Sequence, residues 1–285
     1  MNLQIGLQLF SVRNELMKSP ERTFERISGI GYENLELFIH DASNGVRFCG
    51  LSAKELKRLL DANNLRIVSS HVGILGSVDW DELIEYNREI GSSAIVCPME
   101  LGIADPYAFC EKMNRYGEIC RSYGMDFYYH NHFEVYQRFG DKTLLEILLE
   151  RTDKDLVKIE FDTYWALRGG GDPVAWLERL GDRCDLVHQK DIPASVQPVN
   201  VFETISDRDP ITMESFMPFA KPENFTEIGC GVMDIRGILD TLKKIGAARY
   251  LFVEQDLTTI GELESIARSY HNITALLAET EGAGA

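Results

Sequence analysis

The chain has 285 residues, of which 45% are hydrophobic, and it carries six cysteines and a formal net charge of −16. This length can bury one large core or two small ones, and no apolar run approaches the ~20 residues that a membrane-spanning helix needs. The acidic charge and the lack of any Lys/Arg cluster argue against nucleic acid and membrane surfaces as partners.

The N-terminal segment and the cysteines both bear on location. The segment MNLQIGLQLFSV alternates like a strand and has no basic stretch before an apolar one, so we expect no signal peptide. The cysteines are scattered and form no Cys-x-x-Cys pair. This pattern favours a reduced, cytoplasmic protein.

Short apolar runs alternate with amphipathic stretches from one end of the chain to the other. The expected strands are residues 3–10, 34–38, 66–72, 93–99, 126–132, 157–163, 184–191 and 250–256. The expected helices are residues 19–31, 52–64, 79–91, 105–124, 141–152, 172–183, 234–246 and 260–279. Ser19 before Pro20, and Ser52, mark helix starts, whereas glycines such as Gly91 and Gly246 mark helix ends.

Strict alternation of strand and helix predicts an α/β fold with parallel strands covered by helices. Eight such units in this length favour a single (β/α)8 TIM barrel over an open sheet. We expect one domain over residues 1–279 and a flexible C-terminal tail over residues 280–285.

One connection is much longer than the others, namely residues 192–233 after the seventh strand. Loops longer than about 15 residues are usually functional or disordered. This one contains Phe202, Phe216, Met217 and Phe219, so it is too apolar for a solvated linker. A lid or wall over the barrel mouth, a packed ornament and an oligomer contact all remain open, and a homo-oligomer is one possible assembly.

The chemistry of a TIM barrel lies at the carboxyl ends of its strands. Polar residues follow or end every expected strand, and they are Gln8, Glu36, His71, Glu100, His130 with His132, Asp162, His188 with Lys190, and Glu254 with Asp256. Four of them, on strands five to eight, are residue types that bind metals. A closed barrel would bring these four to one mouth.

His130, Asp162, His188 and Glu254 therefore form a predicted metal site. Imidazole and carboxylate together suit one divalent ion such as Mn²⁺, Zn²⁺, Fe²⁺ or Co²⁺, and two carboxylates balance its charge. Such an ion could polarise a carbonyl and stabilise an enediolate. Each residue alone has an ordinary structural explanation, but four consecutive strand ends are hard to obtain by coincidence.

Several other residues near the expected mouth have more than one possible role. His132, two residues after His130, could be an acid–base group, a neighbour that orients His130, or a packing residue. Trp165 could stack on a sugar face or pack against the next helix. Lys190 could contact substrate, transfer a proton or pair with Asp191. Gln8, Glu36 and His71 end the first three strands and are expected to bind substrate.

At this point the sequence resembles the xylose isomerase-like TIM barrels, a broad group that includes sugar phosphate isomerases and epimerases, inosose dehydratases and an endonuclease. The motifs that carry the resemblance are GLQLFSVR (6–13), YHNHFE (129–134), FDTYW (161–165), GGDP (170–173), HQKD (188–191), TEIGCGVMD (226–234) and VEQD (253–256). Together they are specific for the superfamily and its YHNH-bearing branch, and they span nearly the whole chain.

The resemblance implies a divalent metal at His130, Asp162, His188 and Glu254. Well-studied epimerases of the group carry glutamate at the first of these positions, where it also transfers protons. Because this chain has His130 there, a proton shuttle between two glutamates is in doubt. Glu254 would need a partner such as His132, Glu134 or Lys190.

Two enzymatic functions and one non-enzymatic function follow from these expectations. The first is a metal-dependent isomerase or epimerase that acts on a keto- or aldo-sugar through a metal-stabilised enediolate, with Glu254, His132 and Lys190 as catalytic groups. The alternative is a metal-dependent lyase or dehydratase that performs β-elimination on a keto-sugar or keto-inositol. A barrel that keeps its metal for structure alone is the third. The lack of a basic phosphate-binding stretch favours an unphosphorylated small-molecule sugar.

Overall fold

A computed structural model describes residues 3–40, 42 and 45–282. The barrel strands are β1 (Gln4–Gln8), β2 (Asn34–Ile39), β3 (Arg66–Val72), β4 (Ala94–Cys97), β5 (Asp126–His130), β8 (Lys158–Asp162), β9 (Leu186–Gln189) and β10 (Tyr250–Val253). They are all parallel and close in the order β1-β10-β9-β8-β5-β4-β3-β2. The predicted (β/α)8 TIM barrel is confirmed.

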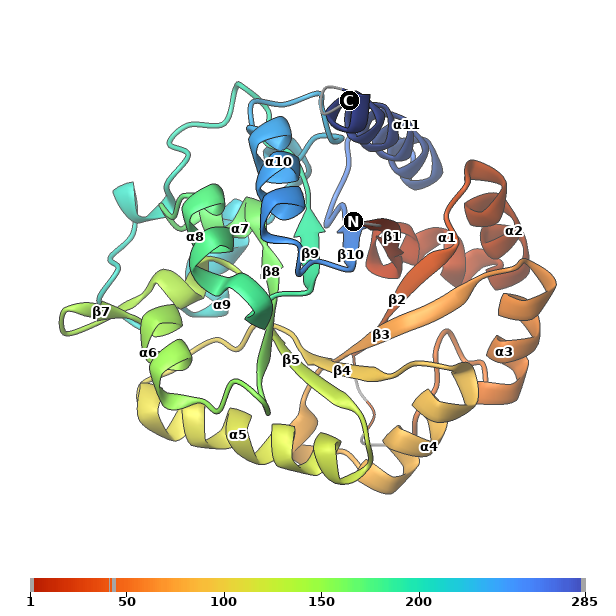
Figure 1. Cartoon of the computed structure of the whole chain (residues 1–285), viewed down its shortest axis with the longest axis horizontal. Coiled ribbons are helices and arrows are strands. Elements are labelled where there is room, and N and C mark those ends of the chain that lie inside the picture. The colour runs from red at the N-terminus through yellow and green to blue at the C-terminus, as the bar shows by residue number, and fades with distance from the viewer. Residues whose placement is uncertain (1–2, 41, 43–44, 283–285) are drawn as a thin grey trace.

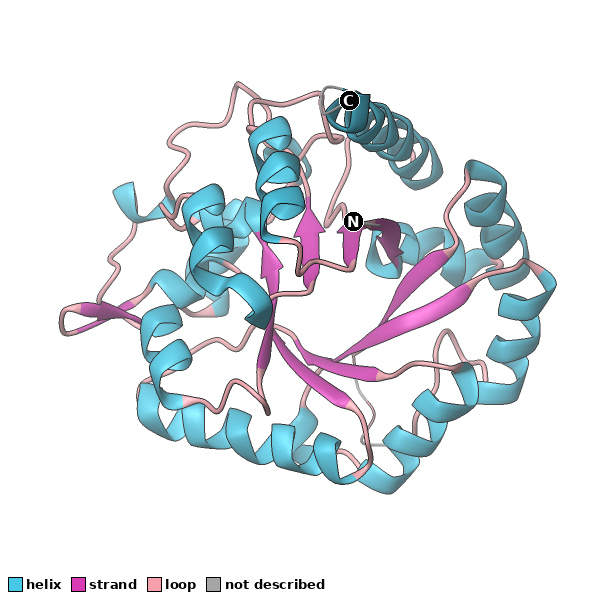
Figure 2. Ribbon diagram, viewed as in Figure 1, coloured by secondary structure: helices cyan, strands magenta, loops and turns pink. Residues whose placement is uncertain are grey.

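Helices surround this barrel on the outside (Figures 1 and 2). They are α1 (Arg13–Lys18), α2 (Pro20–Ile30), α3 (Ala53–Ala62), α4 (Trp80–Ile90), α5 (Pro106–Ser122), α6 (Leu144–Arg151), α7 (Thr163–Arg168), α8 (Pro173–Leu180), α9 (Met213–Phe216), α10 (Ile235–Ile245) and α11 (Glu262–Gly282). A small hairpin of β6 (Arg138–Phe139) and β7 (Lys142–Thr143) precedes α6. No helix in the described part of the chain is long and apolar enough to cross a membrane.

The expected helix signals act as the sequence indicates. The Ser52 side chain accepts a hydrogen bond from the Glu55 amide, and the Glu55 carboxylate accepts one from the Ser52 amide, which together form a capping box at the start of α3. Gly91 and Gly246 end α4 and α10 with φ of 85° and 79°, a left-handed conformation that glycine adopts without strain.

Several boundaries differ from the expectation. Strand β5 ends at His130 rather than at residue 132, so His132 lies just beyond the strand in an extended conformation. The expected helix 141–152 starts only at Leu144, because Lys142 and Thr143 pair with the β6 strand. Helix α11 continues to Gly282, so the first residues of the predicted tail are helical, and residues 283–285 lie outside the described part.

The barrel interior is layered, because alternate residues of each strand point inward. An apolar plug fills the inside of the barrel below the strand ends, and it consists of Ala94, Val96, Tyr128, Leu186 and Phe252. Gly6 of β1 makes room for this plug, since a Cβ atom there would overlap the Phe252 ring. His130, His188 and Glu254 each follow a plug residue by two positions, so the next layer towards the carboxyl ends is polar.

The connection at 192–233 is folded onto the barrel and contains α9 and short 3₁₀ helices. Asp191 anchors its two ends, because one buried carboxylate accepts hydrogen bonds from the backbone amides of Ile192, Gly229, Gly231 and Met233. This anchoring holds the apolar middle of the connection close to the carboxyl ends of the strands.

Candidate metal and active site

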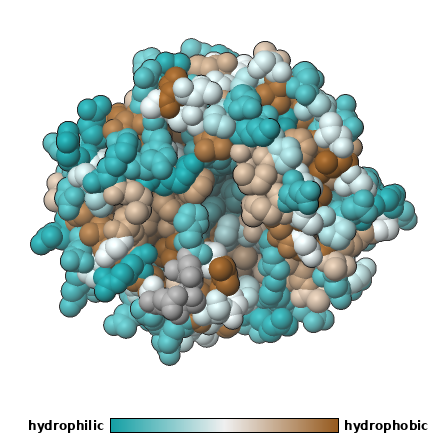
Figure 3. Space-filling model, turned by 180° about the vertical axis from the view of Figure 1, so that it is seen from behind, coloured by the Kyte–Doolittle hydropathy of each residue, from teal (hydrophilic) through white to brown (hydrophobic). Residues whose placement is uncertain are grey.

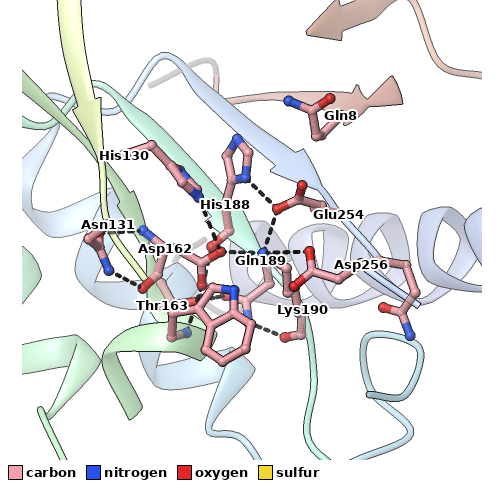
Figure 4. Close-up of polar contacts among 12 residues, drawn as sticks. Gln8, His130, Asn131, Asp162, Thr163, His188, Gln189, Lys190, Glu254 and Asp256 are labelled. Atoms are coloured by element: carbon pink, nitrogen blue, oxygen red, sulfur yellow. Dashed lines mark hydrogen bonds and ion pairs between the residues drawn. The ribbon is translucent and has the colours of Figure 1, made fainter. Parts of the chain in front are cut away.

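The four predicted metal ligands meet at the carboxyl ends of their strands. His130, Asp162, His188 and Glu254 are all buried, and one ligand atom from each lies within 4.8 Å of the others. Figure 4 shows their side chains pointing towards one another. His188 Nδ1 lies 2.8 Å from Glu254 Oε2, and His130 Nε2 lies 3.9 Å from Asp162 Oδ2. Two imidazoles and two carboxylates are a donor set that fits a borderline divalent cation.

Asp162 is held in place by backbone contacts on both sides. Its Oδ1 accepts the Trp165 amide at 2.8 Å, which makes it the N-cap of α7. Asn131 bridges the adjacent strand ends, because its side chain accepts from the Asp162 amide and donates to the Asp162 carbonyl. The residue pair Asp162–Asn131 therefore fixes β5 and β8 relative to each other.

Lys190 places its ammonium between Asp162 and Glu254 and forms short ion pairs with both (Figure 4). Asp256 Oδ1 lies 3.5 Å from the same nitrogen. Burial alone would raise the pKa of Glu254, but Lys190 and His188 outweigh burial and hold the pKa below its ordinary value. Burial raises the pKa of Asp256 to about 7, against the opposing effect of Lys190.

Glu160 is the important residue that the strand-end reasoning missed. It lies two residues before Asp162 on β8 and is fully buried. Its Oε2 lies 2.5 Å from His71 Nε2, 3.2 Å from His130 Nδ1 and 3.3 Å from His188 Nε2. The signal was available, since the two-residue period of a strand turns Glu160 to the same face as Asp162.

A second possible ligand group therefore overlaps the first. His71, His130, Glu160 and His188 also offer ligand atoms within 4.8 Å of one another. The two groups share His130 and His188, which direct one ring nitrogen towards each. Both groups have two residues that line an open pocket, but the group with Asp162 and Glu254 suits a divalent ion better, because it offers two carboxylates to balance the charge and the other group offers one.

That pocket has a volume of about 390 Å³, and only some of the remaining predicted residues line it. Gln8, His71 and His132 line it. Glu36 and Trp165 do not line it and are fully buried.

The buried pair lie below and behind the pocket. Glu36 binds Gln8, Ser69 and His188, whereas Trp165 stacks on His132 with ring centroids 4.8 Å apart. Lys190 is fully buried as well and does not line the pocket. Direct contact of Glu36, Trp165 or Lys190 with substrate would therefore require side chains to move. Without such a movement, these residues could act on substrate only through their neighbours.

The comparisons with known proteins agree with this architecture. The xylose isomerase-like TIM barrel family model matches residues 24–270. Since this match covers most of the chain, the protein belongs to that family of closed barrels. The chain is 26% identical to an inosose dehydratase of Lacticaseibacillus casei over 231 residues, which cover 71% of this chain and 73% of the relative.

Two solved structures share the fold. A sugar phosphate isomerase/epimerase of Parabacteroides distasonis superposes with a TM-score of 0.73 at 24% identity, covering 97% of this chain and 96% of that one. The IolI protein, solved with a bound zinc atom, superposes with a TM-score of 0.69 at 12% identity, covering 97% and 99%. At these identities the two likenesses show that the barrel fold is shared.

Glu134 occupies a separate buried position behind the pocket. Its Oε1 accepts a hydrogen bond from the Tyr129 hydroxyl at 2.7 Å, and its Oε2 has no hydrogen-bond partner among the described residues. Burial raises its pKa to about 8. Glu134 is therefore protonated at neutral pH, and ionisation would place an uncompensated charge in the core.

Glutamine at this position should make folding stability less sensitive to pH. The folded pKa lies above the ordinary 4.5, so the folded state holds a proton that the unfolded chain has released, and stability is lost as pH rises towards 8. Relative to wild type, Glu134→Gln should gain about 2 kcal/mol of unfolding free energy between pH 6 and pH 8, measured by urea denaturation. Glu118→Gln, at an exposed position of α5, is the control. An equal difference from wild type at both pH values would contradict the assignment.

Proposed function

We propose that the protein is a divalent-metal-dependent lyase that performs β-elimination on a keto-sugar or keto-inositol. The observation that carries the proposal is the convergence of His130, Asp162, His188 and Glu254 beside an open pocket at the carboxyl ends of the strands. When bound there, a divalent cation would polarise the substrate carbonyl and stabilise the negative charge that develops on its oxygen. The similarity to an inosose dehydratase and the zinc in IolI both support this chemistry.

The pocket supplies groups for both proton transfers that an elimination needs. His132 lines the pocket, and its ring packs against those of Trp165 and Phe216, with centroids 4.8 and 5.6 Å away. We assign His132 as the base that removes the proton next to the carbonyl. Asp256 lines the same pocket, and with its pKa raised to about 7 it can protonate the departing oxygen.

Lys190 and Glu254 then have supporting roles in this proposal. Lys190 is fully buried and compensates the charges of Asp162 and Glu254, rather than reaching into the pocket. Glu254 lines the pocket and serves mainly as a ligand. Proton transfer by either residue, as the sequence predicts, is not required for an elimination that uses His132 and Asp256.

An isomerase or epimerase is the second candidate. It needs the same stabilised negative charge, and the fold is shared with a sugar phosphate isomerase/epimerase. His130 stands where the resemblance places a proton-transferring glutamate, so opposed carboxylates are not available here for a symmetric shuttle. This difference and the dehydratase relative favour elimination.

Glu160 and Glu36 are proposed to orient the two metal-binding histidines. Glu160 Oε2 lies 3.2 Å from His130 Nδ1, and Glu36 Oε2 lies 2.6 Å from His188 Nε2. The Glu36 contact is a hydrogen bond, whereas His130 Nδ1 lies near Glu160 without a hydrogen bond in this structure. If each carboxylate accepts the facing ring N–H once a cation is bound, the other ring nitrogen presents its lone pair to that cation. Carboxylates behind histidine ligands commonly fix the tautomer in this way.

The metal prediction is tested by element analysis of purified protein. Native protein should hold about one equivalent of Mn, Zn, Fe or Co after incubation with these ions. Asp162→Asn and Glu254→Gln should lose it while far-UV circular dichroism stays unchanged, since asparagine also caps a helix. His271→Ala, at an exposed position of α11, is the control. Retention of the full equivalent in both site variants would exclude this ligand set.

Glu160→Gln should weaken divalent-metal affinity by roughly 10–100-fold without abolishing binding, because an uncharged amide is a poorer acceptor for the imidazole N–H groups. Competition with a fluorescent chelator measures the dissociation constant, and the exposed Glu118→Gln is again the matched control. A stoichiometry that falls from two to one would instead make Glu160 a ligand of a second ion. An unchanged dissociation constant would remove its proposed role.

The reaction is tested with keto-inositol and keto-hexoses in D₂O, followed by mass spectrometry. A lyase should release the β substituent as the main product, and His132→Asn should lose at least about 100-fold in turnover while it keeps its metal. His271→Asn should retain full activity. Deuterium incorporation into a sugar of otherwise unchanged mass, without elimination, would favour the isomerase instead.

A further inference from the structure

The pocket above the candidate site has two chemically different halves. The inner half is polar and is lined by Gln8, His71, His130, His132, Glu254 and Asp256. Most of the remaining lining is an apolar collar, which we define as Phe10, Ile39, Pro98, Met99, Phe216, Met217, Ala220 and Leu257, and Arg13, His40 and Gly73 complete the lining. A central hollow with hydrophobic atoms along parts of its rim is visible in Figure 3.

The collar is assembled from four separate connections at the mouth and from Ile39 at the end of β2. Phe10 follows β1, Pro98 and Met99 follow β4, and Leu257 follows β10, whereas Phe216 to Ala220 come from the connection at 192–233. The apolar residues therefore surround the polar half on several sides. The insertion serves as part of the pocket wall, which was one of the three roles left open by the sequence.

The collar side chains cannot form hydrogen bonds with hydroxyl groups. A polyol ring placed among them would lose water around its hydroxyls and gain no partner from the collar side chains, with only Arg13 and His40 as polar side chains nearby, which is unfavourable. A bare keto-inositol carries hydroxyls around its ring and would match only the polar half. The volume of about 390 Å³ lies within the ~300–1,000 Å³ range of pockets that bind drug-sized ligands.

One collar side chain, that of a methionine, is unusually exposed for a hydrophobic residue. Met217 is 51% exposed and lines the pocket, whereas the preceding Phe216 is buried. Methionine adapts its shape to flat apolar and aromatic ligands. At the rim, the Arg13 guanidinium lies 3.9 Å from the centre of the Phe10 ring and packs this aromatic residue from one side.

We propose that the collar is a subsite for an apolar, preferably aromatic, aglycone carried by the keto-sugar. The inference rests on the proposed lyase function and identifies the group that is expelled. The proton next to the carbonyl is removed, the β carbon–oxygen bond breaks, and its electron pair leaves on the aglycone oxygen, which takes up one proton, so that the elimination is balanced. The products are an unsaturated keto-sugar and the free phenol or alcohol, and no oxidant is required.

The subsite is tested by binding, separately from turnover. Phenyl and methyl glucopyranosides of the same anomer lack the ketone and cannot be eliminated, so calorimetry with metal-loaded protein reports affinity alone. The phenyl compound should bind at least about tenfold more tightly than the methyl compound. Met217→Asp should remove most of this preference. Met213→Asp is the matched control, because Met213 is 56% exposed on the same insertion and does not line the pocket.

The outcomes separate the subsite from the reaction. Equal affinity for the two glucosides, or equal effects of the two methionine variants, would overturn the subsite even if keto-sugars are eliminated. A phenyl preference that depends on Met217 supports the subsite. If that preference occurs in a protein that turns over no keto-sugar, the subsite holds and the proposed reaction fails.

Discussion

The mutual compensation of buried charges at the carboxyl ends of the strands is the constraint on which this molecule depends. Lys190 lies fully buried against Asp162 and Glu254, and His188 lies between Glu254 and Glu36. An isolated charge in such a position would cost several kcal/mol, so each of these groups is tolerable only with its partners. Because the partners come from strands distant in sequence, the polar layer also fixes how the barrel closes.

This constraint explains why the fold and much of the site could be predicted from sequence. Parallel strands bring their carboxyl ends to one side, so His130, Asp162, His188 and Glu254 had to approach one another once the barrel was recognised. The alternation of apolar runs and amphipathic helices was sufficient for that recognition. What the strand-end rule could not give was depth along the barrel axis. Glu160, one layer further in, was missed for this reason.

Depth also separates residues that the sequence treats alike. Gln8 and His71 line the pocket. Glu36 and Lys190 are also polar residues near strand ends, but other side chains enclose them. Their enclosure depends on the tertiary packing of neighbours such as Ser69 and Asp256, which no local pattern reveals. Likewise, the aromatic content of residues 192–233 predicted a packed segment, but only the fold shows that Phe216 packs against His132.

The two overlapping ligand groups restrict each other through His130 and His188. A neutral imidazole has one lone pair and one N–H, so a histidine that binds a cation on one side presents a donor to the other. If the cation lies with Asp162 and Glu254, Glu36 is placed to accept the opposite N–H of His188, and Glu160 is the carboxylate nearest to Nδ1 of His130. Occupation of both groups at once would require imidazoles deprotonated at both nitrogens. The arrangement therefore favours one cation beside the pocket, with the inner carboxylates next to the outward-facing nitrogens of its two histidines.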